Sequence, residues 1–135
     1  MADPDGLVRR MTEQLDAIGL DVFAVNHEFM NSQYEINLRH SSALDAADRA
    51  FRLKSAVKDI AAINGLHATF MGKPFNDQGG SGTHLHLSLR RDDANIFDAP
   101  SAEHGVSQEL RQFSAGLIEH AAALMALLNP TINAY

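Results

Sequence analysis

The spacing of apolar residues along the chain predicts three helices. Apolar residues recur every three or four positions in three stretches, residues 4–18, 43–64 and 106–128. This period places them on one face of an α-helix. Gly19 and Gly65 follow the first two stretches, where a C-terminal glycine cap is expected, and Pro130 follows the third. Ser42 is the predicted N-cap of the middle helix.

The same spacing predicts which helical side chains are buried. The expected core positions of the middle helix are Leu44, Ala47, Phe51, Val57 and Ile60. Those of the third helix are Val106, Leu110, Phe113, Leu117, Ala121, Leu124 and Leu128.

Shorter segments rich in β-branched, aromatic or alternating residues predict strands. They cover residues 20–28, 33–40, 67–71 and the alternation within 79–90, followed by a short hairpin-like segment at 92–97. In the second strand, Ile36 and Leu38 share one face and Glu35, Asn37 and Arg39 share the other. Neighbouring strands with short connections favour antiparallel pairing, so the predicted fold class is α+β, an antiparallel sheet packed by three helices.

Composition places the chain among ordinary globular proteins and excludes several classes. Of 135 residues, 45% are hydrophobic and 21% charged, which suits one domain with a core. The net charge of -6 argues against nucleic acid or an anionic membrane as a general partner, because those need clustered Lys and Arg. There is no cysteine and no apolar run of membrane-spanning length. The start, MADPDGLVRRM, lacks a signal peptide's apolar core, so we expect a cytoplasmic protein.

Two glutamates near a predicted turn are candidate metal ligands. If the turn centres on Asn31 and Ser32, Glu28 lies directly opposite Glu35, and paired positions point to the same face. Two adjacent carboxylates repel unless a cation lies between them, and hard divalent cations prefer carboxylate oxygens. Two solvated glutamates at a loop remain the alternative interpretation.

The segment GGSGTHLHLSLR, residues 79–90, carries a second candidate group. Alternation places His84, His86 and Ser88 on one face, where imidazoles could bind a metal or a phosphate. The alternative is an exposed polar strand face. Two histidines are too few for a zinc site, and nearby carboxylates suit Mg²⁺ or Mn²⁺ better. Gly79, Gly80 and Gly82 permit positive φ or a close approach of backbone N–H groups to an anion, although no Gly-Lys-Ser/Thr P-loop follows.

Four stretches in order carry a resemblance to a known family. They are EFMNSQYEI (28–36), ADRAFRLKSAVKDIAAINGLHATFMGKP (47–74), GGSGTHLHLSL (79–89) and NPTINAY (129–135). Together they resemble the catalytic domain of glutamine synthetase, from about residue 22 to residue 135. Within that family, EINLRH and GTHLHLSL lean toward the glutamine synthetase-like enzymes that ligate glutamate to amines. The implied fold is part of the glutamine synthetase catalytic, guanido kinase-like domain.

The resemblance implies a role for each matching residue but assigns no certain catalytic residue. The implied metal ligands are Glu28 and Glu35 for one Mg²⁺ or Mn²⁺ and His84 for a second. The implied nucleotide contacts are Leu38, Arg39, His40, His86 and Ser88. The implied substrate-binding backbone is Gly79 and Gly80. Two departures stand out, because the family's Pro-Gly is Asn31-Ser32 here, and Gly79 replaces an Asn that contacts glutamate in ammonia-using members.

The implied reaction belongs to nitrogen metabolism and glutamine biosynthesis. ATP phosphorylates the γ-carboxylate of glutamate, and ammonia or an amine then displaces phosphate from γ-glutamyl phosphate. The expected partners are therefore ATP, glutamate and ammonia or an amine, with further copies of the chain in a homo-oligomer.

Family subunits are several times longer than this chain. We therefore expect residues 1–135 to be part of a catalytic domain, without the N-terminal β-grasp domain and the C-terminal arginines and last metal-binding Glu. A second hypothesis, from another class, is a non-catalytic and self-associating module derived from the same fold.

We predict that the pure 135-residue chain alone has no ligase turnover, because it holds at most three of the family's metal ligands. The measurement is ATP- and glutamate-dependent product formation with ammonia or methylamine. Detectable product from the pure protein contradicts the prediction.

Overall fold

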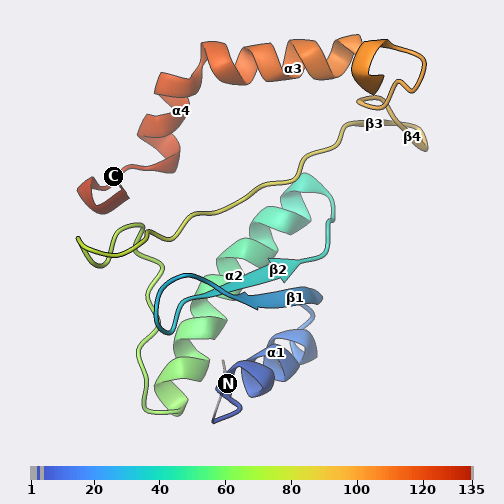
Figure 1. The fold of residues 1–135 in the computed structure, drawn as a ribbon. Coiled ribbons are helices and arrows are strands. Elements are labelled where there is room, and N and C mark those ends of the chain that lie inside the picture. Colours follow the sequence, from blue (N-terminus) through green and yellow to red (C-terminus); the bar gives the residue numbers. More distant parts are fainter. Residues whose placement is uncertain (1–2, 4, 135) are drawn as a thin grey trace. The chain divides into compact units, whose positions relative to one another are not determined.

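The computed structural model describes residue 3 and residues 5–134, and its elements form two units that meet in sequence at Ser81 and Gly82. The N-terminal unit contains α1 (Leu7–Ala17), β1 (Val22–His27), β2 (Tyr34–Leu38) and α2 (Ala43–Ile63) (Figure 1). The C-terminal unit contains β3 (Arg90–Arg91), β4 (Ala94–Asn95), α3 (Gln108–Glu119) and α4 (Ala121–Leu128), with short 3-10 turns at Glu103–Gly105 and Ile132–Ala134. Strands β1 and β2 pair antiparallel, as do β3 and β4, so the predicted α+β class is confirmed.

The core of the N-terminal unit lies between the two helices and the β1–β2 hairpin. Its buried side chains are Met11, Leu15, Leu20, Val57 and Ile60. Leu15 and Leu20 are fully buried. Val22, Ile36 and Leu38 pack against this cluster from the hairpin, so the predicted apolar face of the second strand is confirmed. Helix α1 contacts both α2 and β1, and together these elements fix one face of the hairpin.

Both long helices of this unit end in the same hydrogen-bonded cap. After α1, Gly19 has φ 78°, and the N–H groups of Gly19 and Leu20 donate to the carbonyls of Asp16 and Leu15. This is the Schellman arrangement, in which glycine takes the left-handed backbone and the next residue contacts the last turn. After α2, Gly65 has φ 72° and makes the corresponding bond to Ala62. The glycine caps predicted from the sequence are therefore present.

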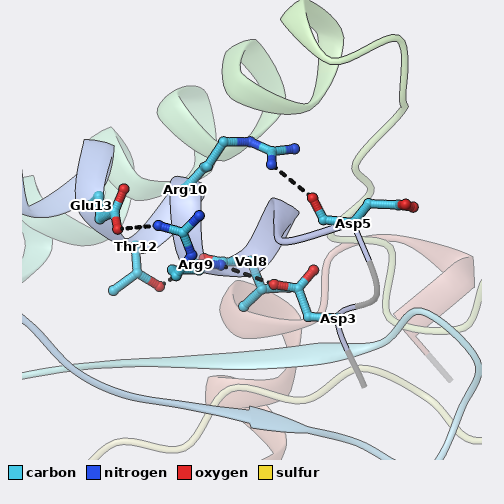
Figure 2. A network of polar contacts seen from close by, with 7 residues as sticks. All are labelled: Asp3, Asp5, Val8, Arg9, Arg10, Thr12 and Glu13. Atoms are coloured by element: carbon cyan, nitrogen blue, oxygen red, sulfur yellow. Dashed lines mark hydrogen bonds and ion pairs between the residues drawn. The ribbon is translucent and has the colours of Figure 1, made fainter. Parts of the chain in front are cut away.

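A carboxylate upstream of α1 binds the exposed N–H groups of its first turn. Asp3 accepts a hydrogen bond from the N–H of Arg9 at 3.2 Å (Figure 2). Desolvation raises the pKa of the Asp3 carboxyl, but the N–H groups of Val8, Arg9 and Leu7 outweigh it and hold that pKa below its ordinary value. The unpaired amides and positive end of a helix favour such a partner. The predicted helix start at residue 4 lies outside the described residues.

The C-terminal unit has a smaller core. Phe97 is buried, and its ring lies 5.3 Å from that of Phe113 on α3. The Ser107 hydroxyl caps α3 by accepting a hydrogen bond from the N–H of Leu110 at 3.0 Å. The predicted hairpin-like segment is confirmed, because β4 pairs with β3 across Asp92 and Asp93.

The single helix predicted at 106–128 is wrong, because the backbone leaves helical values at His120, with φ -102° and ψ 14°. Apolar spacing shows which side chains share a helix face, and it carries no signal for one non-helical residue between α3 and α4. The predicted burial of this stretch is also wrong, since no residue of α3 or α4 is buried in the described part of the chain.

Three further predictions for the N-terminal unit are corrected. Leu44 and Phe51 are each 76% exposed, because α2 carries apolar residues on more than one side and only the side with Val57 and Ile60 meets α1 and the hairpin. Ala47 is exposed for the same reason. Ser42 holds the N-cap position of α2, but its side chain makes no capping hydrogen bond.

Two predicted strands are extended chain without a strand partner among residues 3 and 5–134. Residues 67–71 and 82–89 have no strand assignment, and only Arg90 and Arg91 at the end of the second segment join a ladder. Residue type and alternation favour an extended backbone, but a strand also needs a neighbouring backbone to bond with. Within the described chain, no helix is long and apolar enough to cross a membrane.

We predict that Leu15→Ala lowers the free energy of unfolding by about 2–5 kcal/mol, since it leaves a cavity in a fully buried site. Urea denaturation followed by circular dichroism measures the change. The matched control is Leu44→Ala, expected to change stability by less than about 0.5 kcal/mol because Leu44 is exposed. Equal losses for the two variants contradict this account of the core.

Candidate functional site

The pairing register of the β1–β2 hairpin positions the two candidate carboxylates. Glu35 pairs with Asn26, and the N–H of Glu28 donates to the carbonyl of Gln33 at 2.9 Å. The predicted direct pairing of Glu28 with Glu35 is therefore wrong by two residues. The predicted turn at Asn31 and Ser32 is present, but Phe29 and Met30 precede it as extra loop residues, and they shift the pairing. Glu28 and Glu35 are diagonal neighbours instead.

A shift of two residues preserves the face on which each side chain lies, because strand side chains alternate with period two. Glu28 is opposite Gln33, and Gln33 and Glu35 are two apart, so all three lie on one face. Diagonal neighbours on a sheet are about 7–8 Å apart, a separation that one cation with two carboxylate ligands can bridge. Ile36 packs on the core from the other face, so the face with the carboxylates points away from the core.

The outer face of the hairpin, as we call it, is almost entirely polar. Its side chains are those of Ala24, Asn26, Glu28, Gln33, Glu35 and Asn37. Beside the turn, His27, Glu28 and Phe29 line a hollow of about 290 Å³. The His27 ring meets the edge of Tyr34 at 5.2 Å, which fixes the strand end next to this hollow. The outer face of the hairpin therefore presents oxygen-bearing side chains, and an open surface hollow lies at its strand end beside Glu28.

The turn keeps the backbone shape that the family's glycine would favour. The N–H of Gln33 donates to the carbonyl of Met30 at 3.2 Å, and Ser32 has φ 59°. A positive φ at the third residue of a four-residue turn is typical of a type II turn, where Gly is preferred. Ser32 thus adopts the positive φ that the glycine of the family's Pro-Gly would favour, and a serine is strained in that conformation.

A loop rich in glycine packs against this turn within the same unit. The N–H of Ser81 donates to the carbonyl of Gly72 at 2.7 Å, and the Lys73 ammonium donates to the carbonyl of Gln78. A Cβ on Gly80 would lie 2.7 Å from the Gly72 oxygen, so only glycine fits there. No positive φ occurs at Gly79 or Gly80, so this loop requires glycine for close backbone approach rather than for a left-handed conformation.

The Gln33 side chain joins the turn to this loop. Its Oε1 accepts a hydrogen bond from the N–H of Met30 at 3.3 Å, and its Nε2 donates to the Gly80 carbonyl at 3.1 Å and to the Ser81 hydroxyl at 3.2 Å. No role for Gln33 was predicted from the sequence. The only hint in the sequence is that Gln33 lies in the motif between the two glutamates. Its bonds join residues 47 and 48 positions apart, which no local pattern predicts.

The candidate nucleotide-binding residues of the N-terminal unit lie at the opposite end of the hairpin from the turn. Leu38 ends β2, and the Arg39 guanidinium pairs with Asp21 at 3.3 Å and lies 5.5 Å from the centre of the Phe23 ring. The N–H of Arg39 also donates to the Asp21 carbonyl at 3.1 Å. His40 follows as an exposed residue. The Arg39 side chain is thus restrained by Asp21 and Phe23, and it stays exposed to solvent.

The remaining candidates lie in the C-terminal unit. His84, His86 and Ser88 are exposed residues of the extended segment 82–89. Within the described residues, no three His, Asp or Glu side chains form a group that could hold a metal ion. Glu28 and Glu35 are two carboxylates on one face, a donor type that suits a hard cation, and a cation site there or one shared with His84 stays a prediction.

The sequence and this geometry define the class of protein. Residues 3–135 match the family described as glutamine synthetase, catalytic domain. Because the match extends over nearly the whole chain, the chain belongs to the glutamine synthetase family, a family of ligases. The resemblance identified from four sequence stretches is confirmed.

The relatives include enzymes named glutamine synthetase and one named glutamate–methylamine ligase. The glutamine synthetase of Thermotoga maritima is 46% identical over 121 residues, which are 90% of this chain and 28% of the relative. The glutamate–methylamine ligase of Methyloversatilis universalis is 39% identical over 130 residues, 95% of this chain and 29% of the relative. A solved structure described as a GmaS/ADP complex has a TM-score of 0.89 at 37% identity, over 98% of this chain and 31% of that one. The chain spans less than a third of the length of these proteins.

We predict that Ser32→Gly raises the free energy of unfolding by about 1 kcal/mol, since glycine removes the cost of a left-handed residue in the turn. Thermal or urea unfolding measures it. The control is Ser41→Gly, a loop position without positive φ, where glycine only adds freedom to the unfolded chain. A loss of stability in Ser32→Gly contradicts the positive-φ turn.

Proposed function

We propose that this chain supplies a divalent-cation site and part of the substrate site of an ATP-dependent ligase that joins glutamate to ammonia or an amine. The observation that carries the proposal is the position of Glu28 and Glu35 on one polar face, beside the loop that contains Gly79 and Gly80. Membership of the glutamine synthetase family supports the ligase chemistry.

Each implied metal ligand has a part in this proposal. Glu28 and Glu35 would hold one Mg²⁺ or Mn²⁺, because hard cations prefer carboxylate oxygens. His84 is the proposed ligand of a second ion. A bound divalent cation would neutralise charge on the transferring phosphoryl group. Two carboxylates with no cation between them would instead repel the negatively charged substrates.

The substrate residues of the chain act by positioning. The backbone at Gly79 and Gly80 holds glutamate, and its close approach to Gly72 fixes where that backbone lies. Leu38, Arg39 and His40, together with His86 and Ser88, contact the nucleotide. The reaction then transfers the γ-phosphoryl group of ATP to the γ-carboxylate of glutamate, with ADP as product. The amine nitrogen attacks the acyl carbon of γ-glutamyl phosphate, and phosphate leaves.

A second candidate is a non-catalytic, self-associating module. The observation that favours it is the exposure of large apolar side chains of the N-terminal unit, where Phe29 is fully exposed and Ile63 is 83% exposed. A self-associating module would bury such side chains between copies. The metal titration below separates the two candidates, because the second one needs no cation site.

We predict that Mn²⁺ raises the thermal midpoint of the chain, and that Glu28→Ala combined with Glu35→Ala abolishes the rise. At a metal concentration one hundred times Kd, binding to the folded state adds about 2.7 kcal/mol to stability. Differential scanning calorimetry with increasing Mn²⁺ measures it.

The matched control is Glu103→Ala combined with Glu109→Ala, which removes the same charge from exposed positions in the C-terminal unit. This control should keep the full rise. The absence of any shift at millimolar Mn²⁺ refutes the cation site and favours the non-catalytic module.

A further inference from the structure

Gln33 uses both ends of its amide at a junction between two functional segments. Its Oε1 accepts from the N–H of Met30 at 3.3 Å, and its two Nε2 hydrogens reach Gly80 and Ser81 at 3.1 and 3.2 Å. A primary amide is suited to this task because it is a donor and an acceptor at once.

The loop from Gly72 to Ser81 depends on a small number of such bonds. It has no helix or strand of its own. The bond from the Ser81 N–H to the Gly72 carbonyl closes it, and the Lys73 ammonium adds a contact to Gln78. Segments with few buried apolar contacts open locally at low free energy, so each external hydrogen bond has a large influence on the loop.

Gln33 also lies next to the two glutamates of the candidate cation site. It lies opposite Glu28, whose N–H donates to the Gln33 carbonyl at 2.9 Å, and it is two residues from Glu35 on the same face. A cation that binds both carboxylates restrains the backbone opposite Gln33 at Glu28 and the backbone two residues beyond it at Glu35. The amide then transmits that restraint to Gly80 and Ser81.

We propose that Gln33 is a positioning residue that couples cation binding at Glu28 and Glu35 to the order of the glycine loop. The inference rests on the proposed cation site and adds a regulatory link to it. Because coupling between two sites is reciprocal, an amino acid bound at the loop would also tighten cation binding. Cation and amino-acid substrate would therefore bind cooperatively through one side chain.

The experiment is nuclear magnetic resonance of the ¹⁵N-labelled chain with Mg²⁺, which is diamagnetic, as the probe. In the wild type, Mg²⁺ should shift the amide signals of Glu28 and Glu35, and also those of Gly80 and Ser81. It should slow hydrogen exchange of the Ser81 amide by roughly two- to tenfold, the effect of one strengthened hydrogen bond.

Two variants test the acceptor and the donor of the Gln33 amide separately. Gln33→Glu keeps an oxygen for the Met30 N–H but loses the donor to Gly80, and Gln33→Met removes both. In each variant the signals of Glu28 and Glu35 should still respond to Mg²⁺, while those of Gly80 and Ser81 should not. The charge-matched control is Asn37→Asp, on the same face, which should behave as the wild type.

The outcomes distinguish this inference from the function it rests on. If Mg²⁺ binds and the loop responds equally in Gln33→Glu and Gln33→Met, the coupling is refuted and the cation site stands. If the wild type shows no response at Glu28 and Glu35, both proposals fall. A metal-free comparison tests the hydrogen bonds alone, since unchanged Ser81 exchange in both variants would also refute the role of Gln33.

Discussion

The pairing register of the β1–β2 hairpin determines which way every candidate ligand on it points. Ile36 and Leu38 turn one face of β2 toward the core, and the alternation of a strand then directs Glu35 outward. A slip of one residue in β1 would move Glu28 to the core face and separate the two carboxylates, whereas the two-residue offset keeps them together. The site is thus a consequence of hydrophobic burial on the opposite side of the same two strands.

Local caps and the four-residue turn hold that register. The Schellman cap after α1 bonds Leu20 to Leu15 and leads the chain into β1, and Gly65 ends α2 with the corresponding hydrogen bonds. At the other end, the turn from Met30 to Gln33 fixes where the strands reverse. The glycine loop is attached to this turn by Gln33, so the candidate cation ligands and the candidate substrate-binding backbone share one structural support.

Much of this could be predicted from the sequence, because helix ends and turns have local signals. Gly19 and Gly65 marked two helix ends, and the four motif stretches identified the family. Several of the misses depend on distant partners. The extended segments 67–71 and 82–89 were predicted to be strands from their residue types. A strand also needs a neighbouring backbone to pair with, which residue alternation does not supply. The exposure of Phe51 and the role of Gln33 likewise depend on which part of the chain lies alongside.

The most direct test of the central claim is paramagnetic broadening of amide signals by substoichiometric Mn²⁺. The account holds that one ion binds between Glu28 and Glu35 on the outer face of the hairpin. It predicts that the amides of Asn26 to Phe29 and Gln33 to Ile36 broaden first and together, ahead of other acidic positions such as Asp45 or Glu109. Broadening that begins elsewhere, or that affects one of the two glutamates without the other, would contradict a shared site.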